Sequence, residues 1–344
     1  MRRSGEIRRV CVVRLGGMGD ILLATPALRA VAERFDTDQI DYVVGKGMQD
    51  AVTGIPYVRR VLTFNKDGQD ARPANFRRFL ADLGAQRYDL FLNFHPSVKT
   101  VLMGLASRAP QVITFKKDRR RQPDTGRVRH AIDDFTKELK PLGIDSVADR
   151  RMDFFVSDAA RASVREKLRD LGGIGGDAPY LVANPAATRD INRWPPDRFT
   201  ALLNRLSSEV PGLRLVLSGG PGDVELASGI AGGVRPEARL LNLAGRVSVK
   251  ELGALLAGAD CVVTADTGPL HIASAVGAPI VCLSGAADPD RTGPTAARDL
   301  VVINRDLPCV SCQGRTCARG DIACMTQMPV EWVFDAVLRR LKEK

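Results

Sequence analysis

Asp20 is the residue of this sequence best suited to accept a proton from a substrate. It ends the string Gly16-Gly17-Met18-Gly19-Asp20, which follows an apolar run typical of a strand and precedes a segment typical of a helix. Ligands of open α/β sheets bind beyond the carboxyl ends of the strands, where glycines let backbone amides approach closely. A carboxylate in such a turn can take the proton of a bound hydroxyl. The competing interpretation is that Asp20 only caps the helix that follows.

The glycine string also excludes two common nucleotide-binding motifs. Gly16-Gly17-Met18-Gly19 lacks the Gly-x-Gly-x-x-Gly spacing of dinucleotide-binding loops, and no Gly-Lys-Ser/Thr follows, as a Walker loop requires. The sequence therefore argues against a dehydrogenase and against a kinase.

A second candidate loop is Asp266-Thr267-Gly268-Pro269-Leu270-His271, which follows the apolar run 261–264. Asp266 or Thr267 can cap the predicted helix, whose free N–H groups and positive dipole end suit a diphosphate. His271 lies four residues after Thr267, which places both on one side of the helix. The alternative for His271 is a purely structural histidine.

Two further loops of the second half carry polar residues. Thr188, Arg189 and Arg193 follow the apolar run 180–183, and these cations could neutralise phosphates. Asp223 and Glu225 follow the run 213–218 and could accept hydrogen bonds from ribose hydroxyls. The alternatives are a solvated loop for the first group and helix capping by Asp223 for the second.

The elements that would position these loops alternate between short apolar runs and helical patterns, which predicts parallel βαβ units and an α/β fold. Two sheets are expected, separated by the Gly- and Pro-rich segment 172–179, so we predict domains 1–175 and 176–344. The segment 330–344 is a predicted helix that could pack on either domain. The expected strands are 7–15, 39–44, 61–64, 89–94, 111–115, 180–183, 213–218, 240–243, 261–264 and 279–284, with helices including 27–35 and 74–83.

Composition sets the class of partner. A net charge of +10 and a pI near 9.5 favour anionic partners. Aromatic residues make up only 5% and are not interleaved with basic stretches, which disfavours nucleic acid. No apolar run approaches the roughly 20 residues that span a bilayer, and the start of the chain leads into a strand pattern. We expect a cytoplasmic protein.

Taken together and in this order, the motifs resemble glycosyltransferase family 9, the ADP-heptose:lipopolysaccharide heptosyltransferases, over nearly the whole chain. The resemblance implies a GT-B fold of two Rossmann-like domains whose parallel sheets face a central cleft. The first domain would bind the acceptor and the second the nucleotide sugar. The matching strings are Arg14-Leu15-Gly16-Gly17-Met18-Gly19-Asp20, Thr188-Arg189 with Arg193-Trp194-Pro195, Gly219-Gly220-Pro221, and Asp266-Thr267-Gly268-Pro269-Leu270-His271 followed by Gly285.

The resemblance also implies roles. Asp20 would be the general base of an inverting transfer of heptose from ADP-heptose to a hydroxyl of the lipopolysaccharide inner core, on Kdo or heptose, without a catalytic metal or other cofactor. The acceptor would lie against Gly17, Met18 and Gly19. The expected donor contacts are Thr188, Arg189, Arg193, Asp223, Glu225, Val247 (against the adenine), Asp266, Thr267, Gly268 and His271.

One position departs from the family pattern. Members commonly have Lys two residues before the Trp-Pro pair, where this chain has Asn192. This departure keeps open a transferase for another nucleotide sugar or for a protein acceptor. A nucleotide-sugar epimerase is a further alternative, since it can share the architecture, and so is a binding protein for anionic lipid or nucleic acid.

Basic residues of the first half are candidate acceptor and membrane contacts. Arg59 and Arg60 stand before a predicted strand, and Arg119, Arg120 and Arg121 lie in a basic loop after another. We expect them to bind the carboxylates and phosphates of the acceptor and to draw the protein to the inner face of the cytoplasmic membrane as a peripheral protein. The alternative is that these residues are solvated loops.

Four of the seven cysteines cluster near the end, as Cys309, Cys312, Cys317 and Cys324. Their spacing resembles a zinc ribbon in part and provides enough thiols for one structural zinc or iron ion. Because disulfides rarely persist in a reducing cytoplasm, the alternatives are a metal ion and free thiols.

Overall fold

The computed structural model describes residues 7–118, 120–175 and 178–343. The chain forms two compact units that divide between Phe155 and Val156. The sequence placed the boundary near residue 176, which lies outside the described residues. The division falls earlier because helix α6 (Asp158–Gly172) packs on α9 (Val249–Ala257) of the second unit, where Lys167 and Ser163 both bind Glu251.

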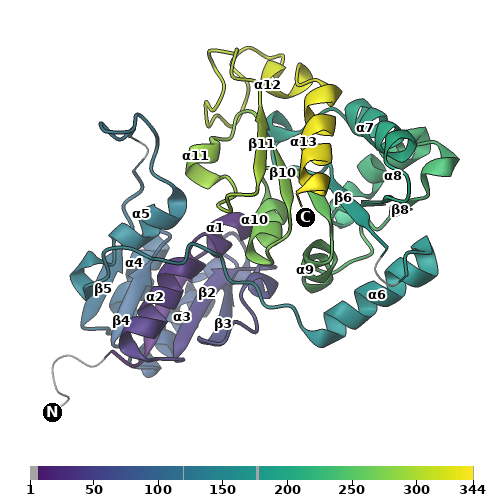
Figure 1. Ribbon diagram of the computed structural model, residues 1–344. Coiled ribbons are helices and arrows are strands. Elements are labelled where there is room, and N and C mark those ends of the chain that lie inside the picture. The colour runs from purple at the N-terminus through teal and green to yellow at the C-terminus, as the bar shows by residue number, and fades with distance from the viewer. Residues whose placement is uncertain (1–6, 119, 176–177, 344) are drawn as a thin grey trace. The chain divides into compact units, whose positions relative to one another are not determined.

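The first unit contains a parallel sheet with the strand order β3-β2-β1-β4-β5. Its strands appear in purple to blue in Figure 1. The strands are β1 (Val10–Arg14), β2 (Ile40–Gly45), β3 (Val58–Phe64), β4 (Leu90–Asn93) and β5 (Gln111–Thr114), and the helices are α1 (Met18–Leu22), α2 (Thr25–Phe35), α3 (Pro73–Ala85), α4 (Val98–Ala106) and α5 (Ala131–Lys137).

The second unit contains a six-stranded parallel sheet with the order β11-β10-β9-β6-β7-β8. Helix α13, yellow in Figure 1, packs on α7 and on β9 to β11, so the carboxyl-terminal helix covers the sheet of the second unit. The strands are β6 (Tyr180–Asn184), β7 (Arg214–Leu217), β8 (Leu240–Asn242), β9 (Cys261–Ala265), β10 (Ile280–Ser284) and β11 (Leu300–Ile303), and the remaining helices are α7 (Pro196–Glu209), α8 (Val224–Gly233), α10 (Gly268–Ala275), α11 (Pro289–Thr292), α12 (Ala323–Thr326) and α13 (Val330–Lys342).

Each sheet reverses its strand order at one point. In the first unit the chain turns from one side of β1 to the other, so β1 and β4 are neighbours. In the second unit the same happens between β6 and β9. A crevice opens at the carboxyl ends of strands at such a switch point, and ligands of open α/β sheets bind there. The two switch points are therefore where the site of each unit is to be sought.

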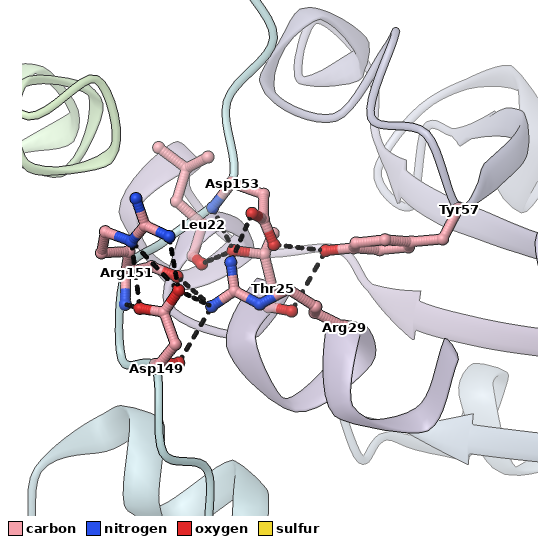
Figure 2. A network of polar contacts seen from close by, with 7 residues as sticks. All are labelled: Leu22, Thr25, Arg29, Tyr57, Asp149, Arg151 and Asp153. Carbon is pink, nitrogen blue, oxygen red and sulfur yellow. Dashed lines mark hydrogen bonds and ion pairs between the residues drawn. The ribbon is translucent and has the colours of Figure 1, made fainter. Parts of the chain in front are cut away.

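A polar network ties the last segment of the first unit to α2 (Figure 2). Arg29 pairs with Asp153 at 2.7 Å, and Asp153 accepts a hydrogen bond of 2.7 Å from the Tyr57 hydroxyl. The backbone N–H of Asp153 binds the Thr25 hydroxyl at 2.8 Å, while Arg29 also binds the backbone oxygens of Asp149 and Arg151. The chain is thus fixed to the first unit almost up to the point where that unit ends.

Asp299 joins the starts of β10 and β11, because its carboxylate accepts a hydrogen bond from the Ile280 N–H at 3.3 Å. Burial raises the pKa of Asp299 to about 6. A raised carboxyl pKa contributes stability that is complete below the unfolded pKa near 4 and is lost as the pH rises through 6.

We therefore expect Asp299→Asn to raise the free energy of unfolding of the second unit by about 1–2 kcal/mol at neutral pH and to leave it unchanged near pH 4. Urea unfolding followed by tryptophan fluorescence measures this, since Trp194 and Trp332 both belong to the second unit. Equal differences at both pH values would contradict the assignment.

None of the helices within the described residues combines the length and the apolar character that crossing a membrane requires.

Candidate functional site

Asp20 lies at the switch point of the first sheet, directly after β1. It is the third residue of α1, whose N-cap is Gly17 without a side-chain cap. Asp20 is therefore not the N-cap of this helix. The carboxylate lies over Gly16, where an added Cβ would come within 3.0 Å of its Oδ2 atom. Glycine at this position leaves room for the acid, whose side chain remains 49% exposed.

Arg14, the last residue of β1, holds the Asp20 carboxylate in place. Its Nη2 atom lies 2.8 Å from Asp20 Oδ2, and its Nη1 atom donates to the Phe94 backbone oxygen at 2.8 Å. The guanidinium also lies 5.6 Å from the centre of the Phe135 ring. Only 14% of the Arg14 side chain is exposed. The acid is thus oriented by a cation that is itself fixed to β4 and α5.

His95 follows β4, the strand beside β1, and so flanks the same switch point. Burial, followed by the charges of Arg14 and Lys66, lowers the pKa of His95 and so favours the neutral imidazole. Its Nδ1 atom is buried and has no partner among the described residues. Sequence reasoning missed this setting of His95, because it depends on the pairing of β1 with β4.

Basic residues line the carboxyl ends of the neighbouring strands. Lys46 follows β2, Lys66 follows β3, and Lys116 and Lys117 follow β5. A depression of about 630 Å³ beyond β5 is lined by Lys116, Lys117, Asp118, Arg120, Lys137 and Glu138. The edge of the first sheet that carries Asp20 is therefore suited to an anionic molecule.

Within the basic loop, the two described arginines of the predicted triplet have local partners. Arg120 pairs with Asp118 at 3.1 Å, and Arg121 donates to the Gly126 backbone oxygen at 2.9 Å. Arg119 lies outside the described residues. The exposed guanidinium groups of this loop remain candidate contacts for the acceptor or a membrane.

Arg59 and Arg60 lie inside β3 and not before it, and both bind Asp41 of β2. The distances are 2.7 Å from Arg59 and 2.5 Å from Arg60 to the same carboxylate oxygen. Tyr88 donates to that oxygen as well, at 2.6 Å. Asp41 is fully buried and pairs in register with Cys11, three residues before Arg14. Both cations bind this buried acid and lie away from the carboxyl ends of the strands. They are therefore not part of the acceptor site.

The switch point of the second sheet carries the loop after β9. Thr267 is the N-cap of α10 but makes no side-chain cap. Pro269 has no N–H and the Leu270 N–H donates to the Thr267 backbone oxygen at 3.1 Å, so the Gly268 N–H is the donor that the first turn can offer to a ligand. Asp266 accepts a hydrogen bond from the Thr292 hydroxyl at 2.5 Å, and its other oxygen lies 3.4 Å from Nε2 of His271. His271 is buried beside Asp266. Together these contacts fix the Asp266-Thr267-Gly268 turn.

The loop after β6 lies at the same switch point. Thr188 and Arg189 are exposed there. Arg193 donates to the Ala187 backbone oxygen at 3.3 Å and pairs with Asp190 at 3.1 Å. Arg193 therefore braces the loop, while Arg189 is the more accessible cation.

Asn192 occupies the position where a lysine was expected. Its side-chain oxygen is buried and has no partner among the described residues. Its side chain carries no charge, so it supplies no positive charge to this loop.

The remaining predicted donor residues follow β7 and β8, on the other side of β6. Asp223 accepts a hydrogen bond from the Gly220 N–H at 2.8 Å and so closes its own turn. Glu225 is exposed and Val247 is half-buried. Every predicted donor contact thus lies in a loop or in the first turn of a helix that follows β6, β7, β8 or β9, at the carboxyl edge of the second sheet.

The four clustered cysteines lie in the segment beside the carboxyl end of β10, where Ser311 and Gln313 donate to the backbone oxygens of Gly285 and Ala286. Cys309 and Cys312 are exposed, Cys317 is half-buried and Cys324 is buried. Among the described residues, no group of three or more His, Cys, Asp or Glu side chains is arranged to hold a metal ion.

Comparison with known proteins agrees with this arrangement. Residues 76–323 match the family model of glycosyltransferase family 9 (heptosyltransferase). The chain is 28% identical over 330 residues to lipopolysaccharide heptosyltransferase 1 of Pseudomonas aeruginosa, an alignment that covers 90% of this chain and 87% of that protein.

Solved structures show the same fold. A glycosyltransferase family 9 protein from Veillonella parvula is 22% identical, with a TM-score of 0.85 and 98% of both chains covered. The Escherichia coli heptosyltransferase WaaC with ADP is 24% identical, with a TM-score of 0.67 and coverage of 97% of this chain and 99% of that one. The two parallel sheets are those of a GT-B fold, as the sequence predicted.

Proposed function

Because this chain belongs to glycosyltransferase family 9 and is a glycosyltransferase, we propose that it moves a heptose from ADP-heptose to a hydroxyl of the lipopolysaccharide inner core, on Kdo or heptose. The observation that carries the proposal is the pair of switch points. One presents an oriented carboxylate on a basic edge, and the other presents an uncapped helix start beside an exposed arginine.

In the proposed reaction Asp20 accepts the proton of the acceptor hydroxyl while that oxygen attacks the anomeric carbon. The bond from this carbon to the diphosphate breaks, and the configuration inverts. A carboxylate is a weak base, so positioning and stabilisation of the leaving group supply most of the acceleration. Arg14 provides the positioning, since it fixes the carboxylate at 2.8 Å.

On the donor side, the Gly268 N–H at the start of α10, together with Thr188, Thr267 and Arg189, would stabilise the departing diphosphate. Asp266 and His271 hold the turn that presents them. The ADP bound to the related WaaC protein supports an adenine nucleotide. Val247, Asp223 and Glu225 would then lie on the nucleoside side of the pocket.

The test has two steps. A thermal-shift screen of nucleoside diphosphates should give its largest stabilisation with ADP, because ligand binding to the native state raises the unfolding temperature. Turnover of ADP-heptose should then require a deep-truncated lipopolysaccharide acceptor. Stabilisation by another nucleotide alone would instead indicate a different donor, and nucleotide release without any acceptor would indicate an epimerase.

The reaction as proposed needs no metal ion, and the cysteine cluster is a separate prediction. Hydrogen bonds from the backbone N–H of Ile322, and from those of Arg319 and Gly320, lower the pKa of Cys317 and favour the thiolate that a metal ligand requires. The spacing predicts about one zinc or iron ion per chain. Elemental analysis of protein purified without an affinity metal tests it, and a stoichiometry near zero would remove the hypothesis.

A further inference from the structure

Helix α4 exposes an apolar stripe on its outer face. Val98, Val101, Leu102 and Leu105 recur at the spacing of one helix face and are 80%, 48%, 41% and 71% exposed. Val112 of the edge strand β5 is 48% exposed, and its Cγ1 atom would lie 3.6 Å from a Cβ at Gly104 of α4. These residues are five of the nine large apolar side chains that are exposed in the described part of the chain. We call this surface the α4 stripe.

The opposite face of α4 is the one that is buried. Thr100, Met103 and Gly104 are buried against the sheet. Ser97 and Thr100 form a capping box, so the helix is well fixed at its start. The buried face of α4 therefore already covers the sheet, and the apolar side chains of the stripe are not part of the hydrophobic core. Contiguous exposed apolar patches of this kind mark interaction sites.

The charge around the stripe indicates which kind of partner it would bind. From Leu90 to Lys117 the sequence contains Lys99, Arg108, Lys116 and Lys117 but no Asp or Glu. The first unit carries 28 Lys and Arg against 19 Asp and Glu, which is +9 of the total charge of +10. A second copy of this surface would be repelled, whereas an anionic lipid surface would be attracted.

The position of the stripe fits a lipid-linked substrate. Val98 comes three residues after His95, at the end of β4 that flanks Asp20. If the stripe contacts a membrane, a molecule anchored in that membrane can thus reach the basic edge of the first sheet. This argument rests on the proposed function, in which the acceptor is a lipopolysaccharide core.

We propose that the α4 stripe inserts into the interface of an anionic bilayer, with the neighbouring lysines on lipid phosphates. An apolar helix face buried at the boundary of headgroups and acyl chains, together with a basic rim, is how interfacial helices bind membranes. The stripe is the contact that fixes the first unit on the membrane, and the basic loop adds long-range attraction.

The test measures binding to phosphatidylcholine vesicles with and without phosphatidylglycerol, in the absence of any sugar donor. The double variant Val98→Gln/Leu105→Gln should lose about tenfold or more of the binding to anionic vesicles. The double variant Lys116→Gln/Lys117→Gln should weaken binding mainly at low salt. Leu171→Gln, at a residue of α6 that is 53% exposed, is the matched control and should bind like the unmodified protein.

Two results would overturn the proposal. One is unchanged vesicle binding by the stripe variant. The other is a change in its mass by light scattering without a change in vesicle binding, which would make the stripe a contact between copies. Because vesicle binding needs no catalysis, a failure of the proposed transfer reaction would leave this measurement intact. ADP binding by the variants reports that the second unit is folded, and an unchanged circular dichroism spectrum of the whole chain then reports that the first unit is folded as well.

Discussion

Asp20→Asn should lower kcat by about 10²- to 10⁴-fold, the usual loss when a positioned general base is removed. Asparagine has nearly the shape of aspartate, so it fits over Gly16 and its oxygen can still accept from Arg14. What it loses is the ability to take the proton from the attacking hydroxyl. The affinity for ADP should remain unchanged, because the predicted donor contacts all belong to the second unit. Initial rates and calorimetric titration with ADP measure the two quantities.

The matched control is Asp82→Asn, which removes one charge from the exposed surface of α3 and should leave kcat unchanged. A wild-type kcat in Asp20→Asn would refute the role of Asp20 as base. A loss of ADP affinity in the same variant would show that the substitution perturbs more than the proton acceptor.

Asp41→Ala should destabilise the first unit by about 3–5 kcal/mol, because removal of one partner from a buried ion pair leaves uncompensated charge. Asp41 is fully buried and holds Arg59, Arg60 and the Tyr88 hydroxyl. Burial by itself raises the pKa of Asp41, but hydrogen bonds from Arg59, Arg60 and Tyr88 outweigh it and hold the pKa below its ordinary value. The stabilisation is therefore present above about pH 4 and is lost as the pH falls towards the folded pKa.

Hydrogen exchange of the amides of β1 and β2 is the appropriate measurement, since both tryptophans lie in the second unit and do not report on the first. Exchange in Asp41→Ala should become faster there at neutral pH. Asp38→Ala, at an exposed residue just before β2, should change the stability by no more than about 0.5 kcal/mol. Equal protection in the two variants would show that the buried acid is not needed to hold the sheet.

The sequence predicted ten of the strands because each is a short apolar run between turn residues. It missed β11 (Leu300–Ile303), a strand of only four residues at the edge of the sheet. It also placed the domain boundary too late, since the Gly-rich segment 172–179 is the more obvious break in the sequence. Helix α6, which precedes that segment, could be assigned to the second unit only through its packing on α9.

Within the site, the loops were predictable and the partners of the side chains were not. Asp20 and the Asp266 loop each follow a strand, so their place at a sheet edge follows from local pattern alone. Arg14, His95 and Asp41 depend on which strands are neighbours, and strand order is a long-range property. For this reason Arg59 and Arg60 were expected to bind the acceptor, although their partner lies in the adjacent strand.

The network around Asp153 joins the end of the first unit to the helix that carries Asp20. Arg29, Tyr57 and Thr25 clamp the chain as far as Asp153, and α6 begins at Asp158 with a capped end at Ser157. The Thr25 hydroxyl, which accepts from the Asp153 N–H, also donates to the backbone oxygen of Leu22, the last residue of the helix that carries Asp20. One hydroxyl thus links the segment that ends the first unit to the helix of the proposed base.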